Sequence, residues 1–188
     1  MTAPTVSDFP ARQAAKLART AEFGQQRTYT ETISPDKLLR MNRYIDELGE
    51  PHLHLAGLKL WVHGYQYRDA GDYWDGNWLN ATAICSENGA TVLVRGAFIR
   101  TNEIYDWQLA VDKLLADMEG EAKLVCMEPE IGVTLKARFL GAVEMEVQIT
   151  PDQLTQEHRF TFAIDQSYLL PLSSQCVRLL NDFPRRCN

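Results

Sequence analysis

The sequence lacks any long hydrophobic run. No stretch approaches the length of about 18 consecutive apolar residues that a membrane-spanning helix requires. The first residues also lack the basic segment and the apolar segment of a secretory signal peptide. We therefore expect a cytoplasmic protein without a membrane partner.

Basic residues are in the minority. The chain has 19 Lys and Arg against 25 Asp and Glu, so its formal net charge is -6 at pH 7. A nonspecific nucleic-acid binder needs a basic surface that neutralises phosphates and releases counterions. The charge balance therefore disfavours nucleic acid as a partner and favours a basic protein, whose approach an acidic surface would accelerate.

Catalytic and cofactor motifs are missing as well. The chain has no G-x-S-x-G turn for a nucleophile, no phosphate loop and no glycine pattern for a dinucleotide. Its four cysteines form no C-x-x-C spacing. Cys85, Cys126 and Cys176 lie in apolar runs, where a free thiol behaves as a small hydrophobic group. We expect these three to be buried and reduced, and we expect no cofactor.

The first 50 residues contain two predicted helices joined by a polar segment. Residues 8–23 have a weak apolar face, and residues 24–33 are consistent with a linker or a marginal strand. Ser34, Pro35 and Asp36 then supply a cap, a first-turn proline and a carboxylate at the positive end of a helix over residues 35–48. We therefore divide the chain into a helical arm and linker (1–50) and a main domain (51–188).

Alternating apolar residues predict strands in the main domain. The pattern covers residues 55–67, then 78–85 and 91–99, and the last two are joined by Asn88-Gly89, a strong hairpin signal. A helix over 102–118 follows, capped by Thr101 or Asn102 and ended by Gly120. Its inward residues are expected to be Ile104, Trp107, Val111, Leu114, Leu115 and Met118.

A second hairpin is predicted between residues 131 and 149. Both of its apolar sets fall on odd-numbered residues, so an odd loop is needed to bring them to one face. That register places Arg138 opposite Glu144 and Lys136 opposite Glu146. A strand then follows, and a helix with Pro171 in its first turn ends before Pro184. The inward residues of that strand are Phe160, Phe162 and Ile164.

Together these elements predict an α+β fold. We expect a mainly antiparallel sheet of about six to eight strands, with its apolar face covered by helices near 102–118 and 167–183. The helical arm is an N-terminal extension that covers a sheet edge or makes contacts in a homodimer.

The most informative segment is the aromatic loop, residues 64–79, which joins two of the predicted strands. Its sequence is Gly-Tyr-Gln-Tyr-Arg-Asp-Ala-Gly-Asp-Tyr-Trp-Asp-Gly-Asn-Trp-Leu. Solvated connections are normally small and polar, so such aromatics need either a core to pack into or a partner to meet. We expect Trp78 to pack inside, one of the aspartates to cap the turn, and an exposed Trp74 to mark the centre of an interface.

The loop resembles the opening signature of the WapI-type bacterial immunity proteins. The later order of elements agrees with that family, including a helix with Trp107, the pair Glu128-Pro129, a hairpin and a closing strand and helix. The resemblance covers roughly residues 55–184 and departs from the family pattern at Arg68, where the family often has proline. It implies a non-enzymatic protein that occludes a cognate toxin.

The residues that we expect to contact this partner lie in the aromatic loop and at the Glu-Pro pair. For Glu128, a structural role and an interface role are both open. The candidates are Tyr67, Asp69, Asp72, Tyr73, Trp74, Asp75, Asn77 and Glu128.

Two other functions remain open. A self-associating structural or stress scaffold would use residues 1–50. A small metal-dependent hydrolase would take its ligands from His52, His54, His63, Asp69, Asp72 and Asp75. The aspartates do not have the spacing of an EF-hand, and no cysteine is spaced for zinc beside the histidines. We therefore expect surface or strand-edge histidines and no bound metal.

Overall fold

The computed structural model describes residues 35–70 and 72–186. The chain divides into two units, residues 1–45 and 46–188. The expected helix at 8–23 and the linker at 24–33 lie outside the described residues. Helix α2 (Pro35–Glu47) begins at the predicted proline and is followed by Gly49 at a φ of +68°, a left-handed conformation that suits glycine.

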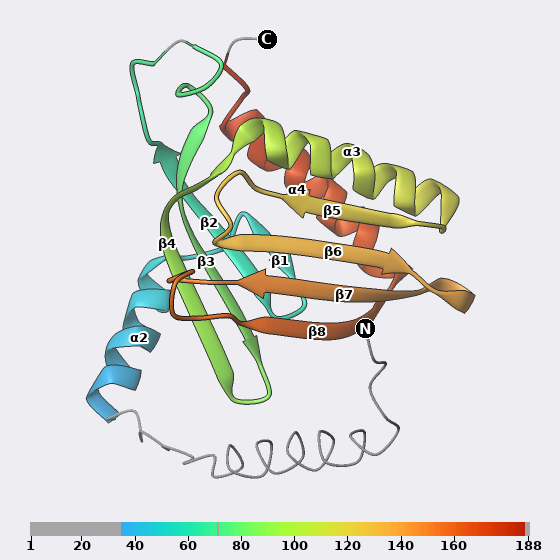
Figure 1. The fold of residues 1–188 in the computed structure, drawn as a ribbon, viewed down its shortest axis with the longest axis horizontal. Coiled ribbons are helices and arrows are strands. Elements are labelled where there is room, and N and C mark those ends of the chain that lie inside the picture. The colour runs from blue at the N-terminus through green and yellow to red at the C-terminus, as the bar shows by residue number, and fades with distance from the viewer. Residues whose placement is uncertain (1–34, 71, 187–188) are drawn as a thin grey trace, which may run out of the picture. The chain divides into compact units, whose positions relative to one another are not determined.

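The unit from residue 46 onward contains two four-stranded antiparallel sheets, each with its strands in sequence order. The first sheet consists of β1 (Leu53–Leu55), β2 (Leu58–Tyr65), β3 (Trp78–Glu87) and β4 (Ala90–Arg100). The second consists of β5 (Glu121–Val125), β6 (Ile131–Ala137), β7 (Ala142–Ile149) and β8 (Arg159–Asp165). Figure 1 shows that the strands of one sheet run across those of the other.

Helices α3 (Thr101–Asp117) and α4 (Leu169–Asp182) lie side by side along the sheets, where α3 contacts β5 and α4 contacts β1 (Figure 1). The α+β class and the number of strands are confirmed within the described residues. The division into two sheets was not predicted. The alternation of apolar and polar residues identifies strands and their buried faces, but it does not say which hairpins belong to the same sheet. No helix in the described part of the chain is long and apolar enough to cross a membrane.

The core is formed by the inward faces of both sheets and both helices. Strand β8 contacts β3 and β7 contacts β4, so the two sheets share one hydrophobic core. The inward face predicted for α3 is confirmed, with Leu115 and Met118 only partly buried. Its fully buried residues include Ile104, Trp107, Val111 and Leu114. The predicted inward residues of β8 are buried too, and Pro171 occupies the first turn of α4 as expected.

The strand predicted over 55–67 is interrupted. A tight turn at Ala56-Gly57 separates β1 from β2, and Ala56 adopts a φ of +50°. Glycine is required at position 57 because a Cβ there would lie 2.1 Å from the carbonyl oxygen of Ser86. The next hairpin follows the prediction, since Asn88 (φ +49°) and Gly89 (φ +85°) form the turn between β3 and β4.

The register of the β6–β7 hairpin differs from the prediction by two residues. Glu144 pairs with Lys136, and Glu146 pairs with Thr134. An even shift keeps the apolar residues on one face, so burial is as predicted. The Arg138–Glu144 ion pair still forms, with 2.6 Å between Nη2 and Oε2. The expected pairing of Lys136 with Glu146 was wrong, because a 3-10 turn (Phe139–Gly141) lengthens the connection.

The three described cysteines carry free thiols, and Cys85 and Cys176 are buried as predicted, whereas Cys126 is half-buried. Burial raises the pKa of the Cys85 and Cys176 thiols to about 12. The pKa of Cys126 is also raised, by burial first and then by the charge of Glu103. Thiols of this kind are unreactive packing groups near neutral pH. Cys187 lies outside the described residues.

Candidate functional site

The aromatic loop leaves the first sheet between β2 and β3. Its two ends are joined by a hydrogen bond from the backbone N–H of Gln66 to the carbonyl of Trp78, at 2.8 Å. Three of its aromatic side chains are exposed: Trp74 by 63%, Tyr67 by 49% and Tyr73 by 43%. Trp78 is half-buried rather than inside the core. The loop therefore presents a cluster of aromatic side chains to solvent.

Asp72 fixes the turn that carries Trp74. Its Oδ1 accepts hydrogen bonds from the backbone N–H groups of Trp74 and Asp75, both at 2.8 Å. The bond from Asp75 is the main reason that the pKa of Asp72 is lowered. The predicted capping role of an aspartate is confirmed. Asp69 and Asp75 are exposed on the same loop.

Asn77 ties the loop to two distant segments. Its Nδ2 donates to the carbonyls of Tyr73 and Arg186, both at 2.9 Å. Its Oδ1 accepts from Thr101 Oγ1 at 2.6 Å and from the backbone N–H of Arg186 at 2.9 Å. Asn77 is only 1% exposed, so it is not available to a partner and instead holds the loop in place.

The segment after α4 braces the loop from the other side. The guanidinium of Arg186 donates to the carbonyls of Tyr67 and Arg68, at 3.1 and 2.9 Å, and lies 3.5 Å from the ring centroid of Tyr65. Tyr65 in turn donates its hydroxyl to the carbonyl of Pro184. Sequence reasoning missed this bracing segment, because no local pattern links Arg186 to a loop more than a hundred residues earlier.

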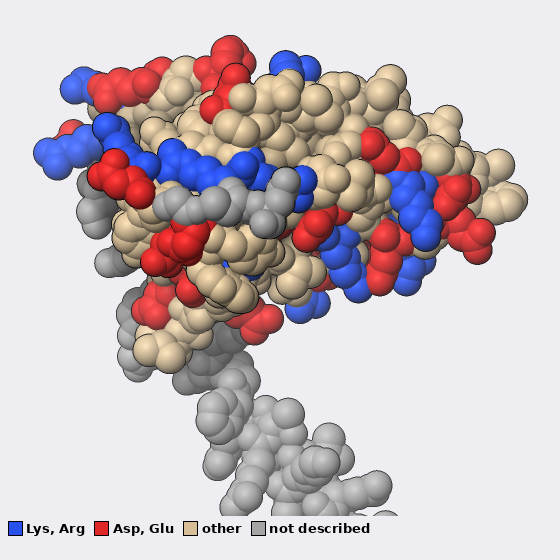
Figure 2. Space-filling view, turned by 90° about the horizontal axis from the view of Figure 1, so that it is seen from above, with Lys and Arg blue, Asp and Glu red and all other residues tan. Residues whose placement is uncertain are grey.

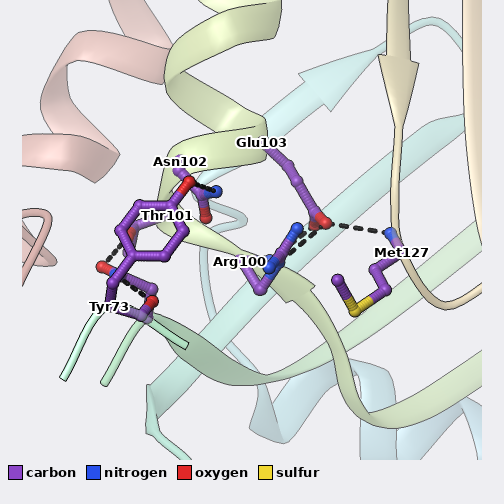
Figure 3. Close-up of polar contacts among 7 residues, drawn as sticks. Tyr73, Arg100, Thr101, Asn102, Glu103 and Met127 are labelled. Carbon is purple, nitrogen blue, oxygen red and sulfur yellow. Dashed lines mark hydrogen bonds and ion pairs between the residues drawn. The ribbon is translucent and has the colours of Figure 1, made fainter. Parts of the chain in front are cut away.

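The loop also packs against the start of α3. Figure 3 shows Tyr73 beside this helix, where its hydroxyl accepts a hydrogen bond from Asn102 Nδ2 at 3.1 Å. The rings of Tyr73 and Trp74 meet edge to face, with centroids 5.3 Å apart.

The prediction that Thr101 or Asn102 caps this helix was wrong. The cap residue is Arg100, and the Glu103 carboxylate accepts a hydrogen bond from its backbone N–H at 2.9 Å.

Glu103 links the same helix to the connection between β5 and β6. Its Oε1 accepts from Arg100 Nε and from the backbone N–H of Met127, both at 2.9 Å (Figure 3). Arg100 and Glu103 form a buried ion pair, and the Arg100 guanidinium also lies 5.4 Å from the Trp78 ring centroid. Through this bridge the β5–β6 connection, which includes Glu128, is held beside the start of α3, where the aromatic loop also packs.

A pocket of about 240 Å³ lies between the loop and this connection. Its lining residues are Gln66, Tyr67, Trp78, Ala97 and Glu128. Two predicted contact residues from separate parts of the sequence, Tyr67 and Glu128, therefore border one pocket. Ala97 lies next to an irregularity in β4, where the register with β3 shifts, and bulges of this kind are common beside functional sites.

The histidines do not converge with the loop aspartates. His52 Nδ1 accepts from the backbone N–H of Val62 at 3.1 Å, and His63 Nε2 lies 2.8 Å from Thr82 Oγ1. His54 is exposed, with Nε2 3.1 Å from the carbonyl of Ala56. Within the described ranges, no three His, Cys, Asp or Glu side chains gather closely enough to hold a metal ion. The geometry gives the metal-dependent hydrolase no support.

The lowered pKa of His52 predicts that folding stability depends on pH. Burial lowers its pKa, against the opposing charge of Asp182, and burial also lowers the pKa of His63. Each histidine therefore binds a proton more readily in the unfolded protein than in the folded one. The contribution to stability is complete above the unfolded pKa of 6.5 and falls as the pH drops through that value.

We expect the free energy of unfolding, measured by urea titration, to fall between pH 7.5 and 5.5. The decline should be shallower in His52→Asn, which keeps an acceptor for Val62. An unchanged slope in that variant would refute the assignment.

Charges of both signs are mixed on the face shown in Figure 2, where acidic and basic side chains alternate with uncharged surface. The acidic excess is therefore not gathered into one continuous patch on this face. On this face, attraction of a basic partner would come from individual carboxylates rather than from a uniform field.

These observations define an α+β domain that presents a hydrogen-bonded aromatic loop beside a small pocket. The model of the immunity protein WapI-like family matches residues 52–184, and the chain belongs to this family. A comparison with curated proteins found no match. Membership of an immunity-protein family suggests a toxin-neutralising role rather than a catalytic one.

Proposed function

We propose that this protein is an immunity protein that binds a cognate protein toxin through the aromatic loop and occludes the surface through which the toxin acts. The observation that carries the proposal is the exposure of Trp74, Tyr67 and Tyr73 on a loop that is otherwise held by partly buried hydrogen bonds. Interface hot spots are enriched in Trp and Tyr. Asp69, Asp72 and Asp75 are exposed on the same loop and supply polar groups for the rim of the interface.

The internal bracing of the loop supports a binding role. Asn77, Asp72 and Arg186 hold its backbone before any partner arrives. A preformed loop loses less conformational entropy on association than a flexible loop does, so a larger part of the contact energy contributes to the binding free energy. Apolar surface of the exposed aromatic side chains is in contact with water in the free protein. A partner that covers this surface gains about 25 cal/mol for each Å² that is removed from water.

Capture from a lysate of the source cells tests this proposal. The full chain should retain one polypeptide, and Trp74→Ala should weaken its binding by about 2 kcal/mol, roughly 30-fold, as expected for a hot spot. Mass spectrometry identifies the retained polypeptide, and titration calorimetry with the purified pair measures the loss.

Phe139→Ala is the matched control. Phe139 is a more exposed aromatic residue, in the turn between β6 and β7, and Figure 1 places that turn at the opposite end of the sheets from the aromatic loop. This variant should bind as the wild type does. Equal losses in both variants would point to nonspecific adhesion, and full binding by Trp74→Ala would remove the loop from the interface.

A further inference from the structure

We propose that the pocket between the aromatic loop and the β5–β6 connection receives one arginine side chain of the toxin. This inference rests on the proposed function and specifies the chemistry that the partner must present. The pocket is smaller than the roughly 300 to 1,000 Å³ of small-molecule sites, with a volume of about 240 Å³. It therefore fits a single long side chain better than a metabolite.

The lining of the pocket selects a cation. Among the described residues that line it, Glu128 is the only charged one, and none is basic. Within the described residues, Glu128 has neither a hydrogen bond nor an ion pair of its own. Glu128 is exposed, so its carboxylate is accessible to a cation that enters the pocket from outside.

The neighbouring arginines do not neutralise this carboxylate. Arg100 is already paired with Glu103 at 2.9 Å. Arg186 lies against the Tyr65 ring and the carbonyl of Arg68, and it does not line the pocket. The charge of Glu128 is therefore left for an incoming group.

The aromatic walls favour a guanidinium over an ammonium. Tyr67 is half exposed and Trp78 half-buried, and both residues line the pocket. Trp78 already has the guanidinium of Arg100 within cation–π distance, at 5.4 Å. A planar guanidinium can stack on such rings and donate two parallel hydrogen bonds to one carboxylate, whereas an ammonium acts as a point charge.

Two small probes test this chemistry without any toxin. N-acetyl-arginine methylamide and its uncharged isostere N-acetyl-citrulline methylamide are titrated into the full chain at low salt and followed by NMR. The arginine probe should give saturable shifts at the Trp78 indole N–H and at the amides of Gln66, Ala97 and Glu128. The citrulline probe should bind about five-fold more weakly or not at all, since an exposed ion pair contributes up to about that factor.

Three variants complete the test. Glu128→Gln should lose about five-fold in affinity for the arginine probe, and Ala97→Leu should block the pocket without changing its charge. Glu119→Gln removes another exposed carboxylate, which does not line the pocket, and should bind as the wild type does. Equal shifts with both probes, or unchanged binding by Glu128→Gln, would overturn the proposal.

The captured toxin separates this inference from the proposed function. If Trp74→Ala loses the toxin while Glu128→Gln and Ala97→Leu keep full affinity, the pocket takes no toxin side chain and the proposed function stands. If the arginine probe binds as expected while Trp74→Ala keeps every captured polypeptide, the proposed function fails, and the assignment of the occupant to a toxin fails with it.

Discussion

Replacing Asn77 by alanine is expected to lower the free energy of unfolding by about 3 kcal/mol, a large fraction of the stability of an ordinary domain. Asn77 is almost fully buried, and its side chain makes four hydrogen bonds that join the aromatic loop, the start of α3 and the segment after α4. Truncation leaves the partner groups of Arg186, Tyr73 and Thr101 without this side chain, and unsatisfied buried polar groups cost about 1 to 3 kcal/mol each.

Urea unfolding followed by tryptophan fluorescence measures the loss, and Asn102→Ala is the matched control. Asn102 loses only one exposed hydrogen bond, to Tyr73, so its cost should stay below about 1 kcal/mol. Hydrogen exchange should also quicken in the aromatic loop of the Asn77 variant, because the loop backbone loses its anchor. Equal stabilities of the two variants would mean that Asn77 does not hold the loop.

Glu103→Gln is expected to destabilise the protein by about 3 kcal/mol. The carboxylate accepts hydrogen bonds from the side chain and backbone of Arg100 and from the backbone of Met127. Glutamine is nearly the same size, but it leaves the buried charge of Arg100 uncompensated, and breaking a buried pair in this way typically costs about 3 to 5 kcal/mol.

Glu144→Gln provides the comparison at the surface. It removes a carboxylate from an ion pair with Arg138 in which both side chains are about half exposed. Such a pair contributes up to about 1 kcal/mol and weakens further with salt. If the two substitutions cost the same in chemical denaturation, burial of the Arg100–Glu103 pair is not what makes it important.

Local patterns predicted most of the secondary structure, because alternation and turn residues act over a few positions. Asn88-Gly89 specified its hairpin, and the apolar faces of β6 and β7 met as expected even though their register was shifted. The interruption at Gly57 was not visible, because the need for glycine comes from the close approach of Ser86, a strand away. The assembly of two sheets also depends on contacts between distant segments.

The candidate site divides in the same way. Composition alone indicated a loop whose aromatics need either a core or a partner, and the structure shows that Trp74 is exposed within it. The role of Asn77 and the bracing by Arg186 could not be predicted, because they depend on contacts across 109 to 119 residues of chain. Glu128 was connected with the loop only through the family resemblance, and the bridge by Glu103 explains how the two come together.

Neutralisation in living cells is the most direct measurement of the central claim. The polypeptide captured by the wild type is expressed in a test strain, alone and together with this protein, and growth is recorded. The polypeptide alone should arrest growth, the wild type and Phe139→Ala should restore it, and Trp74→Ala should not. Growth that is unaffected by the captured polypeptide, or restored equally by Trp74→Ala, would contradict toxin neutralisation through the aromatic loop.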